Sequence, residues 1–320
     1  MSLRLNRCGS LLMVVVLGSL LPAAEQSVAE LLTKASTGLT QFTFDWPQPL
    51  FREALSRATP DSDEWAHATF GLATCRLYVN PVTEDGVAEA TKLFGEILTR
   101  TPTSRFAPNA CMTLGRIAEQ PDFYKDQADL PGARLRYQEV MAKWPDLPMA
   151  GEAALRLAGT YATTNTPEDA RLGITTLQDW LKTHPADPLA AAMYQFMGDT
   201  TYLRLADKAG SLPFYLKADD LGLPSKTKAW KIHWRIAQTA QYEAHDLPLA
   251  IRYYTRICTD SQTSGKAFEA QLALAKLGAP VPELTAFAAY QGTRPAMPKP
   301  AAPAAPAIRA TPATTVEAKP

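Results

Sequence analysis

The chain has 320 residues, of which 46% are hydrophobic and 20% are charged, and its 32 basic and 32 acidic residues give a formal net charge of zero. Near-neutrality argues against a nucleic-acid-binding protein, because such proteins need a basic surface to neutralise phosphates. The length exceeds what one spherical core usually organises, which favours a repeat architecture whose units contact only their neighbours.

Residues 1–29 are typical of a secretory signal. Arg4 and Arg7 precede an uncharged run with its apolar centre at Leu11–Leu21, which is too short for a membrane span. A small-x-small ending predicts cleavage after Ala29, and the alternative is an N-terminal anchor that is kept. We therefore expect an exported, soluble protein of the periplasm or outer cell envelope, with no integral membrane segment after cleavage.

From near residue 27 to residue 290 the apolar residues follow a 3.6-residue period, which predicts an all-α region of about 12 to 14 helices. One pattern recurs in it: Ala, three residues, an aromatic, two residues, an aliphatic, four residues, then Pro. The two full copies are Ala90, Phe94, Ile97 and Pro102, and Ala133, Tyr137, Val140 and Pro145. Weaker copies begin at Phe51, Gly173, Tyr215 and Ala250. The five prolines at 60, 102, 145, 185 and 224 are spaced by 42, 43, 40 and 39 residues, a period typical of stacked repeats.

After each proline turn, a helix rich in small residues carries an aliphatic–small pair. These pairs are Leu72-Ala73, Leu114-Gly115, Leu157-Ala158, Met197-Gly198 and Ile236-Ala237. With these elements the chain resembles the tetratricopeptide repeat family over roughly residues 50–278. The resemblance implies antiparallel helix pairs stacked into a right-handed superhelical solenoid, here with long repeats of about 38–43 residues. The sequence around Pro102, Ser104 and Ala107 is similar to that of bacterial envelope members of the family, such as outer-membrane-assembly lipoproteins and periplasmic cell-division coordinators.

The chain departs from the family pattern at two points. The early tryptophan of the family is never in register, and the interval from Gly115 to Ala133 is longer than the family's. The second departure predicts an enlarged loop at residues 119–131. Residues 291–320 form a tail with seven prolines and nine alanines in 30 residues, which predicts an extended, disordered segment. The domain organisation is thus a signal (1–29), a solenoid (30–290) and a tail (291–320).

The cysteines, histidines and acids form no recognisable reactive motif. Cys75, Cys111 and Cys258 lie in predicted helices and are expected to be buried thiols, and the alternative is a disulfide between the first two. The four histidines are never paired at helical spacing, so no metal or cofactor is expected. Asp219 and Asp220 are neighbours whose side chains face apart on a helix, and we expect them to flank its end near Gly222.

The tryptophans are expected to pack between helices, with one exception. Trp144 and Trp180 stand at helix ends, where an aromatic seals one repeat against the next. Trp230 and Trp234 are one turn apart on a helix that also carries Lys231, so one of this pair is expected to reach an exposed surface. An exposed tryptophan would also suit a glycan ligand.

The sequence favours a non-enzymatic scaffold of the bacterial cell envelope that binds a protein or peptide partner. The alternatives are a glycan- or peptidoglycan-binding module and, less favoured, a hydrolase on a helical frame. In the family the small-rich first helix of each pair lines a concave groove, and the resemblance carries that role to particular positions. The groove residues that it implies are Phe70, Met112, Arg116, Gln195, Asp199, Tyr202, Lys231 and Trp234. Their mixture of apolar anchors and few charges fits an extended or helical segment, and the alternative is that they only pack between helices.

Overall fold

The computed structural model describes residues 26–120 and 127–285. These residues form 13 α-helices and one short 3₁₀ helix, with no strand among them, so the prediction of an all-α chain is confirmed. The helices fall into two compact units, Met1–Ala206 and Asp207–Pro320.

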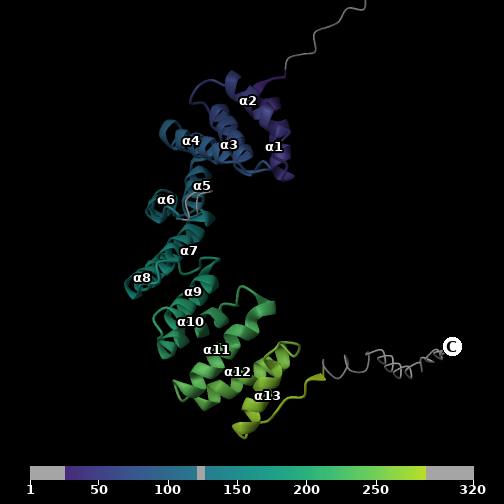
Figure 1. Cartoon of the computed structure of the whole chain (residues 1–320), viewed down its shortest axis with the longest axis vertical. Coiled ribbons are helices and arrows are strands. Elements are labelled where there is room, and N and C mark those ends of the chain that lie inside the picture. The colour runs from purple at the N-terminus through teal and green to yellow at the C-terminus, as the bar shows by residue number, and fades with distance from the viewer. Residues whose placement is uncertain (1–25, 121–126, 286–320) are drawn as a thin grey trace, which may run out of the picture. The chain divides into compact units, whose positions relative to one another are not determined.

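Unit 1 contains the first nine helices, and each of them packs against the next along the chain (Figure 1). Their bounds are α1 Val28–Thr40, α2 Pro47–Arg57, α3 Asp63–Tyr78, α4 Glu84–Arg100, α5 Ala107–Ala118, α6 Leu130–Lys143, α7 Pro148–Ala162, α8 Pro167–Thr183 and α9 Ala190–Leu203.

Unit 2 contains the last four α-helices and the 3₁₀ helix, again packed in sequential order. Their bounds are α10 Lys208–Asp220, η1 Lys226–Lys228, α11 Ala229–Tyr242, α12 Leu247–Asp260 and α13 Ala267–Lys276. Sequential packing of consecutive helices is what a solenoid of the tetratricopeptide type requires. The right-handed superhelical path stays a prediction.

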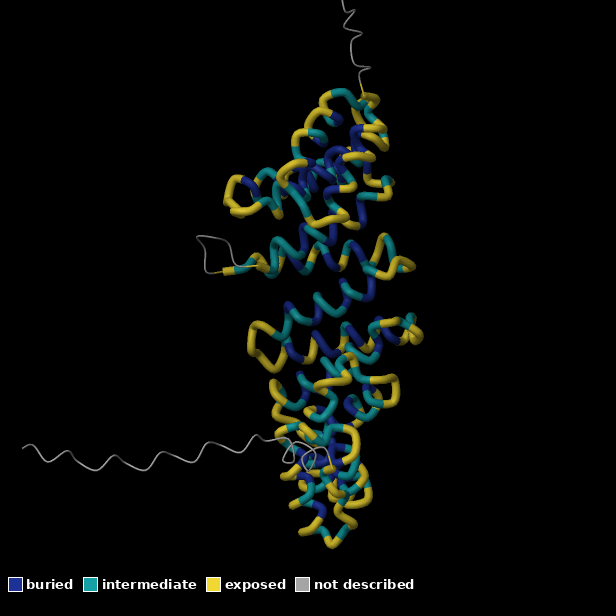
Figure 2. The backbone as a smooth tube through the Cα atoms, turned by 90° about the vertical axis from the view of Figure 1, so that its right-hand side faces the viewer, coloured by how far each residue is buried: buried dark blue, intermediate teal, exposed yellow. Residues whose placement is uncertain are grey.

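The five repeated prolines all lie in turns between two helices, as the spacing predicts. The recurring apolar positions are buried: Ala90, Phe94 and Ile97 are at most 1% exposed, and the same holds for Ala133, Tyr137 and Val140. Figure 2 shows the pattern, with buried residues along the helices and exposed ones at the turns. A local rule, that proline stops a helix and a 3.6-residue apolar period buries one face, therefore sets the architecture.

Close approach between paired helices depends on small residues opposite aromatic ones. A Cβ atom added to Gly71 would lie 2.2 Å from the Phe51 ring, and one added to Gly115 would lie 2.6 Å from the Tyr137 ring. Both rings are fully buried, so neither has room to withdraw. Gly115 belongs to the predicted pair Leu114-Gly115, whereas Gly71 lies next to the predicted pair Leu72-Ala73 and was not itself predicted.

Helix α1 begins inside the segment predicted to be removed. Ser27 is its N-cap, and its side chain and that of Glu30 form a capping box with each other's backbone amides. Leu31 and Leu32 are buried in the core of unit 1. Cleavage after Ala29 would therefore remove the cap and the first turn's opening residues. The remainder of the predicted signal lies outside the described residues, and so does the tail at 291–320.

Three smaller expectations can be compared with the structure. Cys75, Cys111 and Cys258 are buried free thiols, so the expected burial is confirmed and the alternative disulfide is not formed. The loop predicted at 119–131 lies between α5 and α6, although α6 already begins at Leu130. Among the described residues, no helix is both long enough and apolar enough to cross a membrane.

Candidate functional site

The eight predicted groove residues lie on α3, α5 and α9 of unit 1 and on α11 of unit 2. Phe70 packs against Phe94 and Phe106, with ring centroids 5.6 and 5.4 Å apart. Met112 is only 2% exposed, so it belongs to the core and is not accessible to a partner. The side chain of Arg116 is 40% exposed.

The remaining predicted residues lie on two helices of different units. Gln195, Asp199 and Tyr202 are half-buried on α9 of unit 1. In unit 2, Lys231 is exposed on α11, whereas Trp234 is half-buried, with its ring 5.5 Å from that of Tyr254. The expectation that one of Trp230 and Trp234 reaches the surface is met only partly, since both are half-buried.

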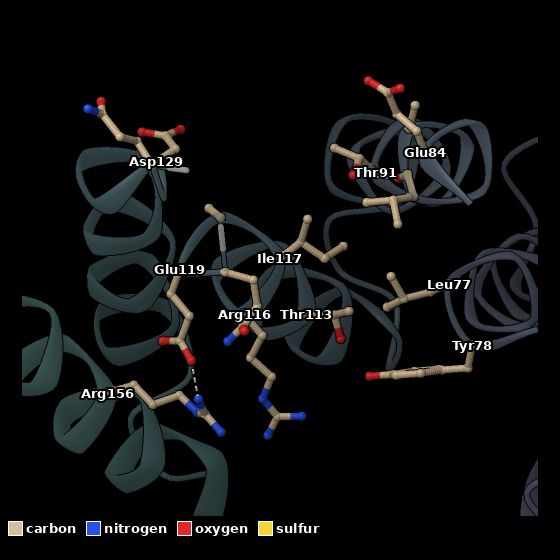
Figure 3. A pocket seen from close by; sticks show the side chains of 15 residues that line it. Leu77, Tyr78, Glu84, Thr91, Thr113, Arg116, Ile117, Glu119, Asp129 and Arg156 are labelled. Atoms are coloured by element: carbon tan, nitrogen blue, oxygen red, sulfur yellow. Dashed lines mark hydrogen bonds and ion pairs between the residues drawn. The ribbon is translucent and has the colours of Figure 1, made fainter. Parts of the chain in front are cut away.

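A cavity of about 700 Å³ opens in unit 1 and includes one predicted residue, Arg116 (Figure 3). Its wall on one side comes from Leu77 and Tyr78 at the end of α3. The rest of the lining comes from one face of α4, one face of α5, residues of the loop before α6 and one residue of α7. The lining residues of α4 and α5 are Glu84, Val87, Ala88, Thr91, Thr113, Arg116, Ile117 and Ala118. Those on α4 follow the spacing i, i+3, i+4 and i+7, which places them on a single helix face.

The floor of the cavity is a network of ion pairs between α5 and α7. Arg116 Nη2 donates to both carboxylate oxygens of Glu152, at 2.8 and 2.9 Å. Arg156 Nε donates to Glu152 Oε1 at 2.8 Å, and Arg156 Nη1 also pairs with Glu119. Two guanidinium groups and two carboxylates make this network formally neutral. Because it joins two neighbouring helical hairpins, it fixes the floor in place.

Tyr137 is hydrogen-bonded to this network. Its hydroxyl donates to Glu119 Oε2 at 2.6 Å, and burial together with this hydrogen bond to a carboxylate raises the pKa of Tyr137. Burial alone would raise the pKa of Glu152, but the hydrogen bonds from Arg156 and the charge of Arg116 lower it below its usual value. The carboxylate of Glu152 is therefore charged at neutral pH, and the hydroxyl of Tyr137 keeps its proton.

One donor in the floor is unsatisfied. Arg116 Nε is buried and has no hydrogen-bond partner among the described residues. A buried donor without a partner costs free energy, of the order of 1–3 kcal/mol, unless something else accepts from it.

The rim carries two acids that the floor does not neutralise. Glu84 lies in the first turn of α4, and Asp129 is the N-cap of α6, where its Oδ1 accepts from Gly132 N at 2.9 Å. Figure 3 shows these two carboxylates on opposite sides of the opening. Both residues are exposed, so the mouth of the cavity is acidic although its floor is neutral.

A second buried polar cluster lies in unit 2, around Asp219. His233 Nε2 is 3.0 Å from Asp219 Oδ1, the hydroxyl of Tyr253 donates to Oδ2 at 2.7 Å, and Arg256 pairs with the same carboxylate. Burial would raise the pKa of Asp219, but these hydrogen bonds hold it well below its usual value. The cluster ties α10, α11 and α12 together.

Asp219 and Asp220 both lie in the last turn of α10, shortly before Gly222, as expected, but only Asp220 is exposed. The reason is that Asp219 lies on the inner face of α10, one turn after the buried Tyr215. Among the described residues, no group of three or more His, Cys, Asp or Glu side chains could hold a metal ion.

Sequence reasoning missed most of the cavity. Leu77, Tyr78 and Val87 look like ordinary helix residues, and Glu84 and Asp129 look like helix-start residues. One signal was present, namely the long interval after Gly115. The loop in that interval supplies Glu119, Gln120, Gln127 and Asp129 to the cavity.

No protein-family model matches the chain. No curated protein matches it either. Among solved structures, the chain is similar to the assembly chaperone of RpL4 (Acl4), residues 1–338, with 12% sequence identity and a TM-score of 0.42. The similarity covers 79% of this chain and 97% of that one. At this level it carries no argument about what the chain does.

Proposed function

We propose that this chain is a non-catalytic scaffold of the tetratricopeptide repeat type, and that it binds a segment of a partner protein at the cavity of unit 1. The observation that supports this most is the cavity itself. Its volume of about 700 Å³ falls within the range of ligand sites, which is about 300–1,000 Å³. It combines an apolar wall with a few fixed polar groups, which is the composition expected of a recognition site.

The arrangement of the floor favours binding over chemistry. Each carboxylate of the floor is held by at least one guanidinium group, so neither is poised to accept a proton from a substrate. The sequence also contains no nucleophile, phosphate-binding or metalloprotease motif. A rigid floor and an apolar wall instead suit a partner that inserts side chains.

The test is a comparison of two tryptophan variants of the full chain. Ala88 is exposed on α4 and lines the cavity, so Ala88→Trp should fill it with little effect on folding. Ala142 is exposed on α6 and does not line the cavity, so Ala142→Trp is the matched control. We expect affinity capture from the native host to lose at least one protein with Ala88→Trp and to keep it with Ala142→Trp. Identical capture by both variants would contradict the proposal.

We also propose that the chain is exported to the bacterial cell envelope and that processing spares Ser27. The charged start and apolar run of residues 1–29 support export, and the capping box of α1 supports a cut before Ser27. N-terminal sequencing of the mature protein from its native host tests both. An intact Met1 would contradict export, and a terminus at Glu30 would contradict the revised boundary.

A further inference from the structure

We propose that the cavity of unit 1 binds an extended peptide segment in which a large apolar side chain stands between two basic ones. This inference rests on the proposed function and specifies the chemistry of its ligand. It follows from three features of the cavity, namely its apolar wall, its neutral floor and its acidic rim.

The apolar wall favours a large apolar residue at the centre of the bound peptide. Leu77, Val87 and Ile117 converge on the cavity with the ring of Tyr78, whose residue is 48% exposed. A leucine-sized side chain would remove this surface from water, and the burial of apolar area favours binding. The cavity is far larger than one side chain, so a segment of several residues fits it better than a single anchor.

The floor of the cavity does not favour a charged side chain in the ligand. Its two arginines and two glutamates cancel, so it offers no net attraction to an anionic or a cationic side chain. Arg116 Nε is buried beneath the surface of the cavity, so it is not offered to a ligand.

The acidic rim favours basic residues on both sides of the apolar residue in the bound peptide. Glu84 and Asp129 lie on opposite sides of the opening, and both residues are exposed (Figure 3). A base on each side of the inserted apolar residue would meet one acid each. Since both acids are exposed, each pair should be weak by itself and sensitive to salt.

The probe is a fluorescein-labelled ten-residue peptide with the core Arg-Pro-Ala-Leu-Pro-Lys, titrated with the full chain and followed by fluorescence anisotropy. Two companion peptides isolate the features. One replaces leucine by serine, and the other replaces both basic residues by glutamate. We expect the affinity to fall at least about 5-fold for the serine peptide and about 10-fold for the glutamate peptide.

Variants of the chain locate the site. Glu84→Gln with Asp129→Asn removes both rim charges, and asparagine keeps the N-cap of α6 because it caps as well as aspartate. The matched control is Glu168→Gln with Asp207→Asn. Glu168 is also in the first turn of a helix, and Asp207 caps α10 with the same bond, to Gly210 N at 2.8 Å.

The rim variant should bind the probe about 3- to 10-fold more weakly and with a smaller salt dependence, while the control variant should change it by less than 2-fold. Ala88→Trp should abolish binding. Equal binding to all variants, or a preference for the glutamate peptide, would overturn the inference. If the probe fails but Ala88→Trp still loses a captured protein, the proposed function stands and only this ligand chemistry is wrong.

Discussion

Replacing Gly115 by alanine should destabilise unit 1, although alanine is the better helix former. In a helix interior, alanine is favoured over glycine by about 1 kcal/mol. At position 115, however, the new Cβ would lie 2.6 Å from Tyr137 Cε1 and 3.0 Å from two further ring atoms. The Tyr137 ring is fully buried and its hydroxyl is bound to Glu119, so it has nowhere to move.

The expected magnitude follows from the two opposing effects. Overpacking a close helix contact costs about 1–3 kcal/mol, so the net change should be a loss of about 0–2 kcal/mol. Gly95 provides the control, because a Cβ added there meets nothing within 4 Å. Gly95→Ala should therefore stabilise the chain by up to about 1 kcal/mol. The two variants should differ by about 1–3 kcal/mol.

Urea unfolding followed by circular dichroism measures both free energies, and a double-mutant cycle identifies the contact. In a Tyr137→Leu background the ring is gone, so Gly115→Ala should lose its penalty and resemble Gly95→Ala. The reasoning would be refuted if Gly115→Ala stabilised the parent chain as much as Gly95→Ala does. In that case the small residue would not determine the approach of α5 and α6.

Three further predictions concern other parts of the molecule. Asp219→Asn should cost about 2–3 kcal/mol in urea unfolding, whereas the exposed neighbour in Asp220→Asn should change stability by less than about 0.5 kcal/mol. The folded chain holds the pKa of Asp219 below its usual value. The contribution of Asp219 to the free energy of unfolding is therefore fully present above about pH 4 and is lost as the pH falls further. Asp219→Asn should remove this pH dependence of stability. Burial raises the pKa of Cys75 and Cys111 to about 12, so iodoacetamide at pH 8 should label them more than about 100-fold faster in urea than in the native chain. Ser27→Ala should cost about 1 kcal/mol and should speed amide hydrogen exchange in α1.

Each of these has an outcome that would count against it. Equal stability of the two aspartate variants would mean that the buried cluster contributes nothing. Rapid labelling of the native thiols would mean that their helices open readily. Unchanged exchange in α1 after the serine substitution would mean that the capping box is not formed in solution.

The fold was predictable because its rules are local. Ala133, Tyr137 and Val140 repeat the spacing of Ala90, Phe94 and Ile97, and a 3.6-residue period has only one buried face. The prolines mark the turns because a helix cannot accept them in its interior. Neither inference needed any knowledge of which helices meet.

The cavity was not predictable, because it depends on which helices meet. Tyr78 and Ile117 are 39 positions apart and acquire a common surface only when α3, α4 and α5 pack. Arg116 was predicted as a groove residue, yet its ion pair with Glu152 on the next helical hairpin was not inferred from the spacing. The burial of Asp219 was not predictable for the same reason, since it depends on α11 and α12.

The most direct test of the account is hydrogen–deuterium exchange of the full chain with and without the leucine-containing basic peptide. The account predicts slower exchange at the end of α3 and along α4 and α5, where the cavity is lined, and no such change with Ala88→Trp. Protection confined to the helices of unit 2, or equal protection in the Ala88→Trp variant, would contradict the claim that the cavity of unit 1 is the binding site.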